Sequence, residues 1–165
     1  MGYGHWVRHL FADEADVRRV LDAAAMARLE QRVRESEARH SGEIRLCIEA
    51  GLPWPWLRRS VRERALAVFA ELGVWDTEAN NGVLIYLLLA EHAIEIVADR
   101  GLMRHVPAGH WEQVLGAMRQ AFQAGRFEEG LAGAIDEVDR LLVQHFPLSA
   151  GERNANELPD APVVR

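Results

Sequence analysis

Apolar and polar residues alternate in two short stretches of the chain, and a third stretch between them is apolar throughout. Residues Glu43–Glu49 and Ala93–Ala98 follow the period of two, which is typical of a strand that turns one face to a core. Residues Val83–Leu89 form the continuous apolar run, which favours a strand covered on both faces. Only three residues, 90–92, join this run to the last stretch. The pattern therefore predicts three strands, of which the last two are antiparallel.

Apolar residues spaced three and four apart predict helices around these strands. Asp22 can cap the first helix, and the pair Ser60 and Glu63 has the spacing of a capping box at the start of the second. The expected helices run, in order, from Asp22 to His40, from Ser60 to Gly73, from Pro107 to Gly125, and from about Glu128 to Leu142.

The order helix, strand, helix, strand, strand, helix, helix predicts an α/β fold with a small mixed β-sheet flanked by about four helices. The strand–helix–strand segment from Glu43 to Leu89 should form a right-handed parallel crossover. We expect the folded domain to span residues 13–147, preceded by an N-terminal extension, residues 1–12. Residues 148–165 contain few apolar residues and many helix and strand breakers, so we expect a disordered tail.

This topology would bring several oxygen-bearing side chains to one edge of the sheet, because the first two strands begin where the third one ends. We call this edge the acidic rim; its members are Glu43, Asp76, Glu78, Asn80, Asn81 and Asp99. Calcium and magnesium ions prefer several oxygen ligands. The sequence thus predicts a Ca²⁺ or Mg²⁺ site at the rim.

A simpler interpretation of the same loop stays open. Asn80, Asn81 and Gly82 have the composition of a turn, and Asp76 could order that turn without any metal. The spacing does not fit an EF-hand, because the closing acid of that loop would fall on Leu87, inside the apolar strand.

The opposite edge of the sheet offers a different candidate, the segment LPWPWLRRSVRER after the first strand. It combines two tryptophans with several arginines: Trp54, Trp56, Arg58, Arg59 and Arg62. Such a loop can hold a protein partner, a lipid headgroup or an anion. Alternatively, the tryptophans fold over the core while the arginines extend into water.

Composition excludes several classes of protein. The formal net charge of −6 argues against general binding of nucleic acid, which requires a basic face. The single cysteine, Cys47, excludes an internal disulfide and fits a reducing compartment. No apolar run is long enough to cross a bilayer, and the first residues lack the apolar stretch of a secretory signal. We therefore expect a cytoplasmic protein.

Three segments of the chain, taken together, are typical of a known family. They are SGEIRLCIE, NNGVLIYLLLAEHAIEIVADRGL and AFQAGRFEEGLAGAIDEVDRLL. In the order and spacing of these segments, the chain resembles the TPM family. This family includes a thylakoid-lumen protein of photosystem repair and many bacterial proteins, and the resemblance covers about residues 22–146. It implies a small α/β sandwich; acid phosphatase activity has been assigned to some members, and some bind calcium. The chain departs from the family pattern where Asn80 replaces an aspartate, Met103 replaces a glutamate, and Gly109 stands at an often acidic position.

Two functional hypotheses follow. The first is a non-enzymatic TPM-like binding or assembly module that contacts a protein partner or a membrane surface through the tryptophan–arginine loop. The second is a phosphoester hydrolase, in which a divalent ion bound by Asp76 and Asp99, with help from Glu78 and Asn81, activates water and Glu43 acts as a base. The missing acids favour the first hypothesis.

Overall fold

The computed structural model describes residues 3–165, and the side chains from residue 7 onward with the exception of residue 108. Four strands form one mixed sheet in the order β3-β2-β1-β4. The strands are β1 (Glu43–Glu49), β2 (Gly82–Leu88), β3 (Ala93–Ala98) and β4 (Val163–Val164). β1 and β2 are parallel, and β3 returns antiparallel to β2. The α/β class and the parallel crossover are confirmed.

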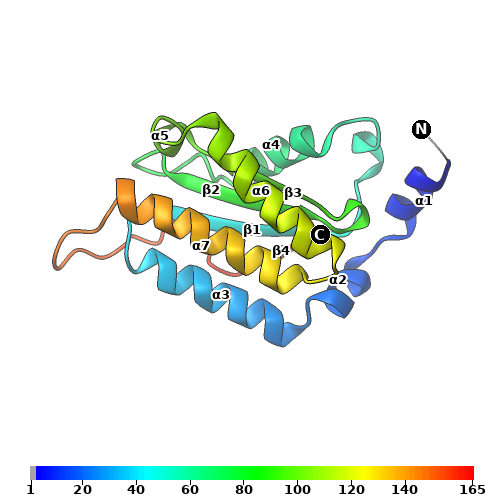
Figure 1. Cartoon of the computed structure of the whole chain (residues 1–165), viewed down its shortest axis with the longest axis horizontal. Coiled ribbons are helices and arrows are strands. Elements are labelled where there is room, and N and C mark those ends of the chain that lie inside the picture. Colours follow the sequence, from blue (N-terminus) through cyan, green and yellow to red (C-terminus); the bar gives the residue numbers. More distant parts are fainter. Residues whose placement is uncertain (1–2) are drawn as a thin grey trace.

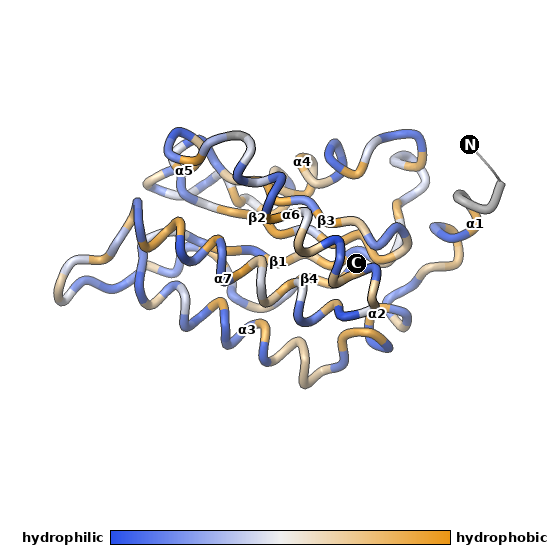
Figure 2. Tube along the Cα trace, in the orientation of Figure 1, coloured by the Kyte–Doolittle hydropathy of each residue, from blue (hydrophilic) through white to orange (hydrophobic). Residues whose placement is uncertain are grey.

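Helices cover both faces of this sheet. The α-helices are α1 (Tyr3–Phe11), α2 (Glu14–Val20), α3 (Ala23–Glu37), α4 (Val61–Glu71), α5 (Arg100–Met103), α6 (Ala108–Gln123) and α7 (Phe127–His145). Two short 3-10 helices are η1 (Trp54–Trp56) and η2 (Leu89–Glu91). α3, α6 and α7 pack on one face, and α4 packs on the other (Figure 1). The apolar stretches of the strands lie between these layers (Figure 2).

Two helices begin at the capping residues that the sequence indicates. The Asp22 side chain accepts a hydrogen bond from the amide of Ala25 at 2.8 Å, and Ser60 and Glu63 form a complete capping box. These side chains satisfy amides that a helix leaves without a partner at its N-terminus. α1 and α2 were not among the expected helices. A capping box of Asp13 and Asp16 starts α2, and it is visible in the sequence as an acid-rich DEAD segment.

β1 differs from the expected strand with one buried face, because both of its faces are buried. Ile44, Leu46 and Ile48 join the core under α3 and α7. Cys47, on the other face, belongs to a second core with α4. Burial raises the pKa of its thiol to about 12, so Cys47 is a structural residue and not a nucleophile.

Residues 148–165 also differ from expectation, since they follow a defined path instead of being disordered. Val163 and Val164 form β4, which pairs in parallel with Cys47 and Ile48 of β1. Without this pairing, β1 would be an edge strand with unsatisfied backbone groups. The segment has too few apolar residues to form a core of its own. It is ordered because it pairs with β1, which the rest of the fold holds in place.

Two charged side chains of β1 hold the same segment in place. The Arg45 guanidinium donates to the carbonyl oxygens of Pro159 and Ala161. The Glu43 carboxylate accepts a hydrogen bond from the amide of Leu158 at 3.1 Å. The polar side chains of β1 thus bind the backbone of the C-terminal segment. The composition of that segment alone does not reveal this contact.

A buried carboxyl group lies under this segment and makes the stability of the fold depend on pH. Glu37 is buried and accepts a hydrogen bond from the amide of Ile44 at 2.8 Å. Burial, helped by the nearby carboxylates of Glu43 and Asp160, raises its pKa to about 9. In the folded chain Glu37 therefore keeps its proton at neutral pH, whereas in the unfolded chain it loses that proton near pH 4 to 5.

Because the folded state binds the extra proton between these two pKa values, the contribution of Glu37 to the free energy of unfolding falls as pH rises from about 5 to about 9. We expect Glu37→Gln to flatten this decline, since the amide keeps the acceptor for Ile44 and cannot ionise. The melting temperature measured at several pH values tests this, with Glu35→Gln on the exposed side of α3 as the control. Parallel curves for the wild type and Glu37→Gln would contradict the assignment.

Candidate functional site

The acidic rim lies at the end of the sheet where β1 and β2 begin. Glu43 is in register with Gly82, and the amide of Asp99 donates to the carbonyl of Gly82 at 2.9 Å. Glu43, Asn81 and Asp99 thus follow one another on three adjacent strand ends, as the topology predicts. Their side chains are all buried.

Two glycines allow the backbone to pack closely at this rim. A Cβ atom on Gly82 would overlap the carbonyl oxygen of Val74, and one on Gly101 would overlap that of Asn80. The amide of Gly101 donates to the same Asn80 carbonyl at 2.8 Å. The loop before β2 therefore lies directly on the start of α5, and a side chain at either glycine would separate them.

Buried oxygen atoms without a partner mark this rim. Asn81 donates through its amide to the Ser41 hydroxyl at 3.2 Å, and one Asp99 oxygen accepts from the amide of Arg100 at 2.7 Å. The remaining side-chain oxygens, Asn81 Oδ1 and Asp99 Oδ2, are buried and have no hydrogen-bond partner among the described residues. A buried acceptor without a donor is costly, so these two oxygens are suited to a cation or a water molecule.

The fit to a metal ion is partial. Hard cations take six or more oxygen ligands, whereas among the described side chains no three or more His, Cys, Asp or Glu form a group that could hold a metal. The buried side chains of the rim that have an unpartnered oxygen among the described residues are two carboxylates, Glu43 and Asp99, and one amide, Asn81; peptide oxygens would have to complete the set.

The other expected ligands lie apart from this buried pair. Asp76, Glu78 and Asn80 are exposed on the loop, and the Glu78 amide donates to the Glu157 carboxylate at 3.1 Å. Asn80 adopts a left-handed conformation with a φ of 51°, as the turn interpretation requires.

Glu43 lies beneath residue 158 and has no exposed surface. Burial raises the pKa of its carboxyl group, and the amides of Leu158 and Glu157 counteract this rise. A base that activates water has to reach that water, and in this conformation the C-terminal segment covers Glu43.

The tryptophan–arginine loop lies at the opposite end of the sheet, where β1 ends. Trp56 is half-buried against the second core, and its ring lies 5.1 Å from the guanidinium carbon of Arg64. Trp54, in contrast, is 69% exposed. The loop therefore combines both interpretations, since one tryptophan covers the core and the other extends outward.

The arginines of this loop are exposed, and ion pairs are described for Arg59 and Arg62. Arg59 lies 3.0 Å from Glu63. Arg62 lies 3.2 Å from Glu95 and donates to the carbonyl of Ile96 at 2.7 Å. Arg58 is exposed as well.

Helix α1 lies beside this loop and was missed in the sequence, where residues 1–12 were expected to be an extension. Among residues 7–11 of this helix, His9 is buried, and its Nδ1 accepts a hydrogen bond from the amide of Leu52 at 3.1 Å. Nε2 must then carry the proton, which it donates to Glu91 at 3.0 Å. Gly51 permits the contact, because a Cβ there would lie 2.6 Å from the His9 carbonyl oxygen. A histidine thus attaches α1 to the sheet.

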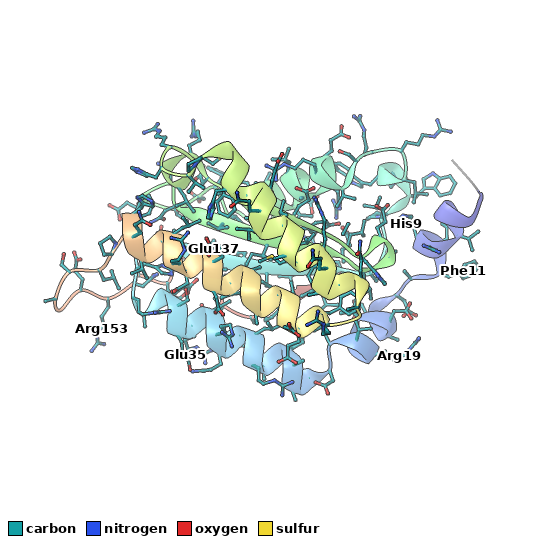
Figure 3. All side chains as sticks on the ribbon, in the orientation of Figure 1. His9, Phe11, Arg19, Glu35, Glu137 and Arg153 are labelled. Carbon is teal, nitrogen blue, oxygen red and sulfur yellow. The ribbon has the colours of Figure 1, made fainter. Side chains whose placement is uncertain are left out.

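Along residues 7–11, the side of α1 opposite His9 is apolar and exposed. Val7, Leu10 and Phe11 occupy positions i, i+3 and i+4 of the helix, so they share one face. Their exposed fractions are 49%, 55% and 79%. Figure 3 shows His9 and Phe11 on this helix at the end of the molecule. The spacing of these three residues was the available sequence signal.

One buried cluster contains the residue types of a hydrolytic triad but has another role. Ser36 Oγ donates to Asp139 Oδ1 and lies 2.8 Å from His40 Nε2. Because serine bridges the other two residues, histidine cannot act as a base oriented by the aspartate. Burial lowers the pKa of His40 to about 4, so its ring is neutral. The cluster joins α3 to α7.

A family model of the TPM domain matches residues 15–141. The chain belongs to the TPM family. Among solved structures, it is similar to the BA42 protein from the psychrophilic bacterium Bizionia argentinensis, with 28% identity, a TM-score of 0.76, and coverage of 88% of this chain and 95% of that one. The N-terminal domain of a P. gingivalis protein shares the fold, at 19% identity and a TM-score of 0.58, with coverage of 79% and 83%.

Comparison with curated proteins found no match. Throughout residues 3–165 of this TPM domain, no helix is both long enough and apolar enough to cross a membrane.

Proposed function

We propose that this chain is a non-enzymatic binding module whose contact surface lies at the end of the sheet where β1 ends. We call it the α1–η1 surface and define it by four exposed apolar side chains, Val7, Leu10, Phe11 and Trp54. The observation that supports the proposal comes from residues 7–11 of α1, where His9 is buried while Val7, Leu10 and Phe11 are exposed.

This arrangement has a physical cost that a partner would remove. A helix on a protein surface normally turns its apolar stripe to the core. Burying a large apolar side chain contributes roughly 1.5–3 kcal/mol, and α1 forgoes this gain at three positions. Several apolar side chains gathered at one end of a molecule are typical of an interaction site.

Replacing Leu10 and Phe11 together by serine tests the proposal. Both side chains are exposed, so the fold should keep its stability while the surface loses most of its apolar area. We expect the tagged full-length wild type in a cell extract to fractionate with a larger assembly or with membranes, and the double variant to fractionate as a free monomer. Met103→Ser removes an equally exposed side chain at the other end of the sheet and should behave as the wild type. Identical profiles for all three proteins would contradict the proposal.

A second candidate role concerns the acidic rim, where Asn81 Oδ1 and Asp99 Oδ2 are buried and no described residue is a hydrogen-bond partner for them. Both oxygens would coordinate a Ca²⁺ or Mg²⁺ ion placed there, and the ion would hold the loop before β2 against α5. In the hydrolase hypothesis this ion would also polarise a phosphoryl oxygen. The buried position of Glu43 leaves that reaction without a base, so we assign the ion a structural role.

Titration of the metal-stripped protein with Ca²⁺ and then Mg²⁺ tests this role. We expect amide shifts confined to residues 79–82 and 99–101 and a higher melting temperature, because a ligand that binds only the folded state stabilises it. Asp99→Asn keeps the helix cap but removes the charge, and should abolish the response, whereas Asp136→Asn on the exposed side of α7 should not. If neither the amide shifts nor the melting temperature changed up to millimolar metal, the rim would bind no ion, and the loop would serve only as a turn that leads into β2.

A further inference from the structure

We infer that the α1–η1 surface binds an anionic membrane surface, with its apolar side chains in the interface and its arginines at the lipid phosphates. This inference rests on the proposed function and specifies the partner. It is carried by the shape of the surface, by the types of side chain and by the position of the charges.

Helix α1 protrudes at one end of the molecule (Figure 1). Figure 1 shows α1 at one extremity of the molecule, outside the helical layers that cover the sheet. Val7, Leu10 and Phe11 lie on the outer side of this helix, opposite the buried His9. A protein partner would need a groove of matching shape, whereas a bilayer deforms around a short apolar ridge and accepts it at the level of the headgroups.

The types of side chain also fit an interface between lipid and water. The amide of Leu52 donates a hydrogen bond to His9 of α1. Trp54 is only two residues further along the chain, so η1 and α1 lie at the same end of the molecule. Tryptophan is enriched at membrane interfaces because its ring is apolar and its N–H is polar. Leucine and phenylalanine on one helix face supply the part that enters the acyl region.

Basic residues frame this apolar ridge, although the whole chain carries a net charge of −6. Arg8 is on α1 itself, and Arg58 and Arg59 follow η1; all three are exposed. The ion pair of Arg59 with Glu63 is exposed on both sides, at 62% and 46%. Because such pairs contribute little, this guanidinium can exchange its partner for a phosphate.

The acids of the neighbouring helix α2 do not oppose this attraction, because arginines of the same helix compensate them. Glu14 lies 2.7 Å from Arg18, and Asp16 lies 3.0 Å from Arg19. With this end of the molecule on the bilayer, the acidic rim at the other end of the sheet would point away from the lipid.

Sedimentation of the full-length chain with lipid vesicles tests the inference. Vesicles of phosphatidylcholine mixed with phosphatidylglycerol should carry the wild type into the pellet, and vesicles of phosphatidylcholine alone should carry much less. Leu10→Ser with Phe11→Ser should weaken binding at least about tenfold, because the inserted apolar area is lost. Arg8→Glu should weaken it about fivefold or more and reduce its dependence on salt. Met103→Ser, outside the surface, should bind as the wild type, and circular dichroism verifies that every variant is folded.

Three results would overturn the inference, and the first two differ in what they mean for the proposed function. If the wild type ignores anionic vesicles but the serine double variant still loses its larger assembly in extracts, the partner is a protein and only the membrane inference fails. If the wild type ignores the vesicles and the double variant fractionates as the wild type does, the proposed contact surface fails as well. Equal binding of the wild type and the double variant to anionic vesicles would also contradict the inference.

Discussion

Replacing Arg64 by alanine is expected to lower the free energy of unfolding by about 3–5 kcal/mol, because it leaves a carboxylate buried without its counterion. The guanidinium makes two hydrogen bonds to Glu49, at 2.9 and 2.7 Å, and the Tyr86 hydroxyl donates to the same carboxylate at 2.6 Å. The side chains of Arg64 and Glu49 are 5% and 2% exposed. Water therefore cannot replace the lost partner. Urea denaturation of the wild type and the variant measures the effect.

Two further variants separate this cause from simple loss of packing. Arg64→Met combined with Glu49→Met and Tyr86→Phe removes both charges and the hydroxyl that would lose its acceptor, and it keeps apolar volume, so it should recover most of the lost stability. Arg59→Ala breaks an exposed pair and should cost less than about 1 kcal/mol. If Arg64→Ala cost no more than Arg59→Ala, the buried pair would not stabilise the contact of α4 with β1.

The same substitution at two glycines is expected to have opposite effects. In Gly82→Ala the new Cβ would overlap the backbone carbonyl of Val74, and no side-chain rotation can relieve that contact. We expect a loss of about 3 kcal/mol or more, at the upper end of what overpacking costs. In Gly133→Ala the new Cβ meets nothing within 4 Å, and an alanine inside α7 should stabilise the fold by roughly 0.5–1 kcal/mol.

Urea denaturation of both variants provides the comparison, and each serves as the control for the other. Amide spectra should place the changes of Gly82→Ala in the loop before β2 and at the start of α5. A mild effect of Gly82→Ala, similar in size to that of Gly133→Ala, would mean that the loop does not pack on β2 as described.

The strands were predictable because their pattern leaves few alternatives. β1 and β3 have the bounds expected from alternation, and β2 is shifted by one residue from the apolar run. The parallel crossover followed from strand order, and it correctly placed Glu43, Asn81 and Asp99 at one rim. Family membership supports the same architecture.

The errors concern polar segments that dock on a scaffold. The C-terminal segment has the composition of a disordered tail, yet Arg45 and Glu43 of β1 bind its backbone. α1 has three apolar residues with helical spacing, but its attachment depends on His9 reaching Leu52 across the fold. Contacts of this kind join residues far apart in the chain, so no local pattern indicates them.

The most direct test of the proposed function is photocrosslinking from the α1–η1 surface in living cells. A benzophenone amino acid would replace Phe11 in the full-length chain, and Trp75, which is 54% exposed on the loop before β2, would be the control position. We predict adducts of higher mass, with protein or with lipid, from position 11 and none from position 75. Adducts from position 75 alone would contradict the account and identify the acidic rim as the contact surface.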